Sequence, residues 1–345
     1  MMEKTTFGSF EAAKNKRGLI IMISLAVLIV IAFIISMNTG YIRLTPMELI
    51  NTLFGRGTDK QELILFQFRL PRIVISVLIG AGLAVSGVVM QGVFRNALAD
   101  PGILGINAGA GIMVMLLISF YPTATAAPVY LLPMVAFVGA GLTAALIYAL
   151  AYKRHQGISP MRLLLTGVAV AAGMSAAMIV LTLRLDPEKY QFVATWLAGS
   201  IWGTSWKFVL SLLPWILILV PYVIYKARVM NVLNLGEQTA VGLGAAVTKE
   251  QFRLLAAAVG LAAASVAVSG GIGFVGLVGP HLARRLVGPK HQLMLPTSAL
   301  LGSLLVITAD TIGRWILQPS EIPTGIVVAV IGAPYFLYLL ARTKS

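Results

Sequence analysis

The chain has 345 residues, of which 58% are hydrophobic and 11% are charged, and its mean hydropathy is +0.91. Soluble domains carry about 25% charged residues, so this composition excludes a soluble globular protein and indicates an integral membrane protein. The chain has no cysteine, and its three histidines, His155, His281 and His291, do not cluster, so neither a metal nor another cofactor is expected.

Apolar segments recur along the whole chain and predict one all-α, polytopic membrane domain over residues 1–345. A helix needs about 20 apolar residues to cross a bilayer, and about ten transmembrane helices are expected. The apolar segments are 19–37, 72–91, 103–120, 129–151, 162–183, 205–225, 254–269, 272–287, 295–312 and 324–341. The seventh and eighth are short and divided by Gly270-Gly271, so nine or eleven helices stay open as alternatives.

Residues 1–18 precede the first apolar segment and include Lys4, Lys14, Lys16 and Arg17. They are expected to form a cytoplasmic tail. The segment 19–37 is too long for a signal-peptide core and lacks a small-residue cleavage site. It is therefore expected to be retained as the first membrane helix.

Two polar connections are predicted to carry short helices on the outer face. The string TPMELI begins at Thr45, which suits an N-cap, and Pro46 suits the first helical position. Residues 184–204 predict an amphipathic surface helix that begins at Pro187. A plain interfacial loop anchored by Trp196 and Trp202 is the alternative there. Residues 94–102, FRNALADPG, are expected to form a short inner loop.

Residues 226–253 form the longest polar interruption in the second half of the chain, KARVMNVLNLGEQTAVGLGAAVTKEQFR. A simple connector between helices needs only a few residues. A break this long, basic and partly helical predicts a docking surface, with a solvated hairpin as the alternative reading.

The distribution of charge predicts that both termini are cytoplasmic. With that orientation, 17 of the 26 Lys and Arg residues lie inside, and the net charges are about +12 inside and +2 outside. The total of +14 therefore follows from membrane topology, and no nucleic-acid partner is needed.

The sequence contains no energy-converting motif of its own. It has no GxxxxGK[ST] string and no Gly-Lys pair, so ATP hydrolysis is expected from a separate subunit rather than from this chain. No predicted helix centre carries an Asp, Glu, Lys or Arg, which ion-coupled carriers usually need at the midplane. A membrane enzyme is disfavoured because no Ser/His/Asp grouping occurs. A self-sufficient secondary transporter or channel stays as the rival hypothesis.

Several strings are characteristic in combination and order. They are RLPR (69–72), GAGLAVSGVVMQGVFRNALADPGILG (80–105), NLGEQTAVGLG (234–244), GGIGFVGLVGPHLARRLVG (270–288), and TAD (308–310) followed by EIPTGIVVAVIGAPYF (321–336). Together they resemble the FecCD/BtuC-type family, the permease subunits of bacterial ABC importers for ferric siderophores, haem and vitamin B12. The resemblance runs from about residue 20 to the C-terminus.

This resemblance implies a multi-pass protein of the bacterial inner or plasma membrane that imports its cargo by ATP-driven alternating access. The implied partners are two cytoplasmic ATPase subunits, a second permease subunit of the same or a similar chain, and an extracytoplasmic substrate-binding protein. An iron–siderophore complex is the expected cargo. Vitamin B12 and haem are the alternatives within the family.

The resemblance also implies two sets of contact residues and a pathway. The ATPase-coupling residues are Gly236, Glu237, Ala240, Leu243 and Gly244, where the glycines set turns and the small Ala240 lets a partner surface approach closely. The residues that dock the binding protein are Arg69, Arg72 and Arg314, because a guanidinium can engage a carboxylate bidentately. An ordinary helix-end charge is the alternative for Arg69 and Arg72. Gate elements are expected at 162–183 and 187–200, and His281 is expected to pack rather than to bind a ligand.

Overall fold

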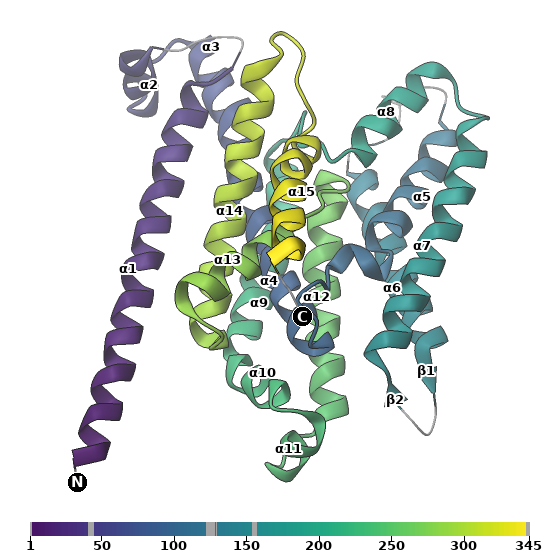
Figure 1. The fold of residues 1–345 in the computed structure, drawn as a ribbon. Coiled ribbons are helices and arrows are strands. Elements are labelled where there is room, and N and C mark those ends of the chain that lie inside the picture. Colours follow the sequence, from purple (N-terminus) through teal and green to yellow (C-terminus); the bar gives the residue numbers. More distant parts are fainter. Residues whose placement is uncertain (1, 41–44, 122–127, 129, 154–156, 343–345) are drawn as a thin grey trace.

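The computed structural model describes residues 2–40, 45–121, 128, 130–153 and 157–342, which form a bundle of helices along a common direction (Figure 1). The elements are α1 (Met2–Asn38), α2 (Pro46–Leu53), α3 (Asp59–Glu62), the π-helix η1 (Leu63–Arg69), α4 (Leu70–Phe94), the 3-10 helix η2 (Pro101–Leu104), α5 (Ile106–Ser119), α6 (Leu131–Ala151), β1 (Tyr152–Lys153), β2 (Gly157–Ile158), α7 (Pro160–Thr182), α8 (Pro187–Leu197), α9 (Trp206–Tyr225), α10 (Ala227–Asn234), α11 (Glu237–Gly242), α12 (Val247–Ser269), α13 (Val275–Val287), α14 (His291–Ile316) and α15 (Thr324–Arg342). The two short strands pair antiparallel.

Each of the ten predicted apolar segments corresponds to a helix for most of its length, which confirms the all-α polytopic fold. Among the described residues, seven helices are long and apolar enough to cross a membrane. The other three, α5, α13 and α15, are shorter or less apolar. Several helices extend beyond the predicted apolar segments. The first helix begins at Met2, so residues 2–18 continue it, and α12 begins at Val247, seven residues before the apolar segment that starts at 254.

The centre of the bundle is built from α4 and α12. In their most apolar windows, 78% and 72% of residues are buried, compared with 17% for both α1 and α7. Close packing of α4 requires glycine, because a Cβ at Gly80 would lie 2.2 Å from the carbonyl oxygen of Gly302 in α14. A Cβ at Gly87 would lie 2.0 Å from the carbonyl oxygen of Gly276 in α13. Small residues thus let three backbones meet where lipid supplies no hydrophobic drive.

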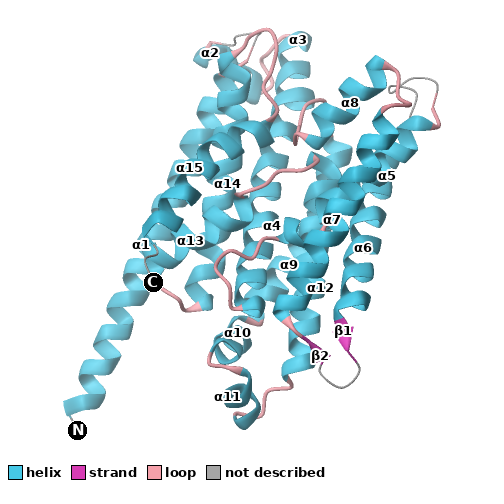
Figure 2. Cartoon of the chain, turned by 45° about the vertical axis from the view of Figure 1, so that its right-hand side comes forward, coloured by secondary structure: helices cyan, strands magenta, loops and turns pink. Residues whose placement is uncertain are grey.

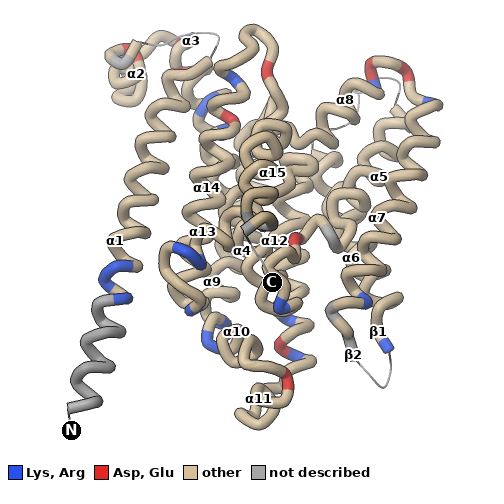
Figure 3. The backbone as a smooth tube through the Cα atoms, viewed as in Figure 1, with Lys and Arg blue, Asp and Glu red and all other residues tan. Residues whose placement is uncertain are grey.

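The molecule has two distinct ends (Figure 2), here named the α8 end and the α11 end. The α8 end carries α2, α3 and α8, and the α11 end carries α10, α11, the β1–β2 hairpin and the N-terminus. Lys and Arg positions of α1, α10, α12 and α13 lie toward the α11 end (Figure 3). Under the positive-inside rule the α11 end would face the cytoplasm.

Both short helices predicted for the α8 end are present. The backbone N–H of Thr45 donates to Glu48 Oε2 at 2.7 Å, and the backbone N–H of Glu48 donates to Thr45 Oγ1 at 3.3 Å. This capping box fixes the start of α2 at Pro46 and holds the pKa of Glu48 below its ordinary value through the bonds from Thr45. The amphipathic segment forms α8, which begins at Pro187 as predicted.

Residues 94–102 were predicted to form a short loop at the inner ends of the helices. Instead, the connection between α4 and α5 runs back into the bundle. A Cβ at Gly105 would lie 3.9 Å from the Cβ of Ala171, which is 11 residues from either end of α7. The turn of η2 therefore lies about half-way along α7, and α5, with 14 residues or about 21 Å, covers only part of a bilayer's thickness. Asp100 caps η2 there, accepting the N–H of Gly102 at 2.8 Å.

Candidate functional site

The α10–α11 segment, residues 227–244, extends from the α11 end of the bundle (Figure 1). Gly236 with φ +111° starts α11, and Gly244 with φ +80° follows it, so both are at positions where a side chain would be strained. The prediction that glycines set these turns is confirmed. The amide of Ala240 closes the first turn of α11 on the carbonyl of Gly236 at 2.9 Å.

Three apolar side chains of this segment face solvent. Leu235 is 62% exposed, Val241 is 59% exposed and Leu243 is 63% exposed, and Glu237 is exposed beside them. An apolar group standing on a polar helix is typical of a surface that a partner covers. Leu235 and Val241 were not among the predicted contact residues. Leu235 precedes Gly236 and Val241 follows it. Because Gly236 interrupts the helix between them, no helical periodicity in the sequence places the two side chains on one surface.

The role predicted for Ala240 was wrong in one respect. Its side chain is fully buried in the main core cluster, so its small size serves packing within the chain rather than the approach of a partner. The residue belongs to the turn in which the N–H of Ala245 donates to the carbonyl of Ala240 at 3.0 Å. The exposed coupling candidates are therefore Glu237, Val241 and Leu243.

Ion pairs fix the base of the α10–α11 segment. Lys226, which precedes α10, lies 2.8 Å from the Glu250 carboxylate in the first turn of α12, and Arg253 lies 3.0 Å from the same carboxylate. These contacts join the two ends of the polar segment 226–253, so α10 and α11 form a loop that is closed at its base between α9 and α12.

At the α8 end, the three predicted docking arginines come together in one buried cluster. Asp310 of α14, 1% exposed, lies at its centre. Arg72 donates to Asp310 Oδ1 from Nε at 3.0 Å and from Nη2 at 2.8 Å, and Arg314 Nε donates to Oδ2 at 3.1 Å. Thr324 Oγ1 donates to Oδ1 at 3.2 Å. The carboxylate is thus fully hydrogen-bonded, which a buried charge requires.

Two of these arginines also hold the end of α1. Arg69 donates to the carbonyl of Met37, and Arg314 Nη1 donates to the carbonyl of Thr39 at 3.0 Å. Arg314 Nη2 also donates to Ser36 Oγ. The last carbonyls of a helix lack partners within it, and cations stabilise them. The cluster therefore joins α1, α4 and α14.

The predicted arginines are consequently engaged within the chain and not displayed as free surface charges. Arg72 is the member nearest to solvent, at 11% side-chain exposure, and its Nη1 donates to Glu321 Oε2 at 2.7 Å. Glu321, at 30%, is the more exposed partner. A docking partner would reach Arg72 at the position that Glu321 occupies.

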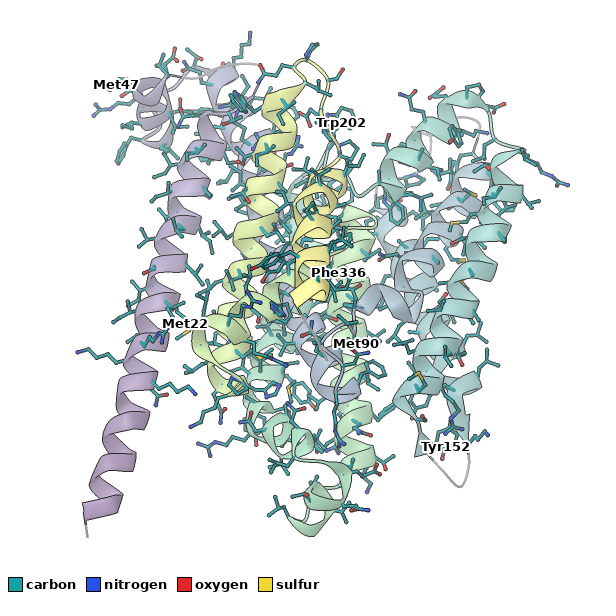
Figure 4. All side chains as sticks on the ribbon, viewed as in Figure 1. Met22, Met47, Met90, Tyr152, Trp202 and Phe336 are labelled. Atoms are coloured by element: carbon teal, nitrogen blue, oxygen red, sulfur yellow. The ribbon has the colours of Figure 1, made fainter. Side chains whose placement is uncertain are left out.

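A cavity of about 540 Å³ lies beside the returning α4–α5 connection. It is lined by Leu98, Asp100, Gly102, Asn107, Val168, Ala171, Gly273, Phe274, Leu277 and Phe336, the last of which is labelled in Figure 4. Non-helical backbone at membrane depth is tolerated where it lines such a cavity. The expected gate helix, now α7, contributes Val168 and Ala171. Within the described part of the chain, no group of three or more His, Asp or Glu residues could hold a metal ion.

Comparison with known proteins gives one consistent result. The model of the FecCD transport family matches residues 27–342. The iron(3+)-hydroxamate import system permease protein FhuG of Bacillus subtilis (strain 168) is 49% identical over 96% of this chain and 99% of its own. The hemin transport system permease protein HmuU of Yersinia pestis is 39% identical over 93% of this chain and 95% of its own.

A solved structure agrees in fold. It is described as an inward-facing conformation of a metal-chelate type ABC transporter, and it superimposes with a TM-score of 0.82 at 33% identity. The match covers 93% of this chain and 99% of that one.

Proposed function

The chain belongs to the FecCD transport family, and from this premise we propose that it is the membrane-spanning permease subunit of a binding-protein-dependent ABC importer. The main supporting observation is that the α10–α11 segment, at the basic end of the molecule, exposes apolar side chains. The chain also has no nucleotide-binding motif. A permease without its own energy source needs a segment that an ATPase subunit can bind and move. The permease alternates access through the bilayer and itself hydrolyses nothing.

An iron–siderophore complex of the ferric hydroxamate class is the proposed cargo. The support is the relative named for iron(3+)-hydroxamate import, which is 49% identical over nearly the full length. Haem is the second candidate, because a relative named for hemin transport is 39% identical. Vitamin B12 is the third. The mostly apolar cavity lining offers only loose contacts, so substrate choice would rest with the binding protein.

The proposed pathway runs along the cavity beside α7 and is completed by a second permease subunit. Two observations support this. The most apolar window of α7 is only 17% buried within the chain, and the cavity is lined by α7, α13 and α15 together with the α4–α5 connection. A second subunit of the same or a similar kind would cover the apolar side chains that α7 exposes.

Transport in proteoliposomes tests the proposal. The chain is co-purified with its ATPase, its permease partner and its binding protein, and uptake of a ferric hydroxamate, haem or vitamin B12 is measured with and without ATP. Uptake of the ferric hydroxamate is expected only when ATP and every subunit are present. Uptake driven by an ion gradient without ATP would favour a secondary transporter, and ATPase activity of this chain alone would contradict the proposal.

Docking of the binding protein is proposed at the α8 end, with Arg72 as the contact residue and the buried Arg69 and Arg314 holding the cluster behind it. Exchanging Arg69 and Arg72 for glutamate would weaken docking but would also break the buried cluster, so Glu321 offers a cleaner test. Glu321→Gln removes the carboxylate that competes for Arg72 Nη1 and leaves Asp310 in place. Docking is expected to tighten by up to about fivefold, the value of a surface ion pair.

The measurement is the affinity of the binding protein for the reconstituted complex at low and high salt. The gain should shrink as salt rises, because the contact is electrostatic. Glu188→Gln removes an exposed charge of α8 at the same end and serves as the control. Unchanged or weaker docking in Glu321→Gln at low salt would remove Arg72 from the docking site.

A further inference from the structure

A side-chain joint connects the α10–α11 segment to α14. The Oδ1 atom of Asn231, in α10, accepts the backbone N–H of His291 at 3.0 Å and lies 2.7 Å from His291 Nδ1. Its Nδ2 donates to Gln292 Oε1 at 2.7 Å. His291 is the first residue of α14, whose N-cap Lys290 supplies no side-chain bond to the helix. Asn231 therefore caps α14 from another helix.

The hydrogen-bond roles at this joint follow from the backbone amide. A backbone N–H can only donate, so the Asn231 atom facing it must be the oxygen. The same oxygen faces His291 Nδ1, which must then carry the ring proton. His291 Nε2 is buried and points toward Gly92 of α4, where a Cβ would lie 3.4 Å from it and 3.1 Å from Met230 Cε. Helices α4, α10 and α14 thus meet at one point.

From this point, α4 and α14 run as one packed pair to the opposite end of the molecule. They meet backbone to backbone at Gly80 and Gly302, and Arg72 of α4 is bonded to Asp310 of α14 at the α8 end. With 25 and 26 residues, each is about 38 Å long. The pair spans the distance between the proposed docking cluster and the α10–α11 segment.

We propose that Asn231 is a positioning residue that transmits movement of the α10–α11 segment to the α4–α14 pair. The inference rests on the proposed function, since the ATPase is what moves the segment. A second polar contact of α10, between Lys226 and Glu250, leads to α12, whereas Asn231 bonds directly to the first residues of α14. Without the oxygen of Asn231, α10 could move while α14 stays in place, and ATP would be hydrolysed without transport.

The test uses the complete importer in proteoliposomes and measures ATP hydrolysed per chelate taken up. Asn231→Ala and Asn231→Leu remove the oxygen, the second with little change in volume, and each is expected to raise this ratio at least tenfold while ATPase activity persists. Asn231→Asp keeps the acceptor for both His291 donors and is expected to lie near the wild-type ratio. Gln292→Ala removes only the exposed outer bond and is the matched control, with no change expected.

Three results would overturn the proposal. The first is a wild-type ratio in an assembled Ala or Leu variant, and the second is an Asp variant as uncoupled as the Leu variant. The third is failure of both the Ala and the Leu variants to assemble, which would assign Asn231 to folding alone. The wild-type complex distinguishes failure of the proposal for Asn231 from failure of the proposed importer function. If it shows no ATP-driven uptake, the importer assignment fails, whatever the variants do.

Discussion

Asp310→Asn is expected to lower the free energy of unfolding by about 3–5 kcal/mol, the cost of removing one partner from a buried ion pair. The carboxylate is 1% exposed and is shared by Arg72 and Arg314. An amide would leave two buried guanidinium groups with the partly exposed carboxylate of Glu321, which contacts only Arg72, as their remaining counter-charge. Their repulsion would also loosen the end of α1, which Arg314 holds through Ser36 and Thr39.

Thermal unfolding of the purified chain in detergent measures this effect. Asp186→Asn is the control. The side chain of Asp186 is 74% exposed and forms a surface ion pair with Lys189, three residues later, at 3.3 Å. Such a pair is worth at most about 1 kcal/mol. Equal melting temperatures for the two variants would show that the cluster around Asp310 does not hold α1, α4 and α14 together.

Leu243→Glu and Val241→Glu are expected to weaken binding of the ATPase strongly and, with it, to reduce transport. Both side chains are mostly exposed on the α10–α11 segment, so a charge there costs the free chain little. In the complex the charge would be buried against a partner. Anchor residues of interfaces contribute about 2 kcal/mol or more, which corresponds to a loss of affinity of about 30-fold or more.

Co-purification of the ATPase measures the loss, and the melting temperature of the chain shows that the fold is intact. Phe54→Glu introduces the same charge at an 80% exposed apolar side chain of the α8 end and is expected to leave ATPase binding unchanged. Ala240→Trp is a different case. Because Ala240 is fully buried, the large ring would unfold the turn before it could block a cleft. Normal ATPase binding by Leu243→Glu would remove α11 from the interface.

Local properties of the sequence were enough to predict the helices. Hydropathy located all ten apolar segments, since a helix that crosses lipid must be apolar along its own length. Thr45 and Pro46 predicted the start of α2, because an N-cap and the first helical position are adjacent residues. Gly236 was predicted correctly as a turn residue from its type alone. Each of these features is decided by neighbours within a few positions.

The environment of the contact residues required the tertiary structure. Arg72 and Asp310 are 238 positions apart and Asn231 and His291 are 60 apart, and no periodic pattern marks such pairs. Ala240 reads as a small surface residue in the sequence, and only the packing of α11 shows that it is buried. The loop through Asp100 reads as an inner connector, but it returns half-way along α7.

Membrane insertion, the number of apolar segments and the family motifs were therefore determined by the sequence itself, because bilayer thickness and backbone geometry act on short stretches of chain. Which arginine meets which carboxylate was decided only when α4 packed against α14, and which side chains stay exposed on the α10–α11 segment was decided by how that segment folds against the bundle. Two glycines, Gly80 and Gly302, permit the close approach of α4 and α14, and this packing brings Arg72 beside Asp310.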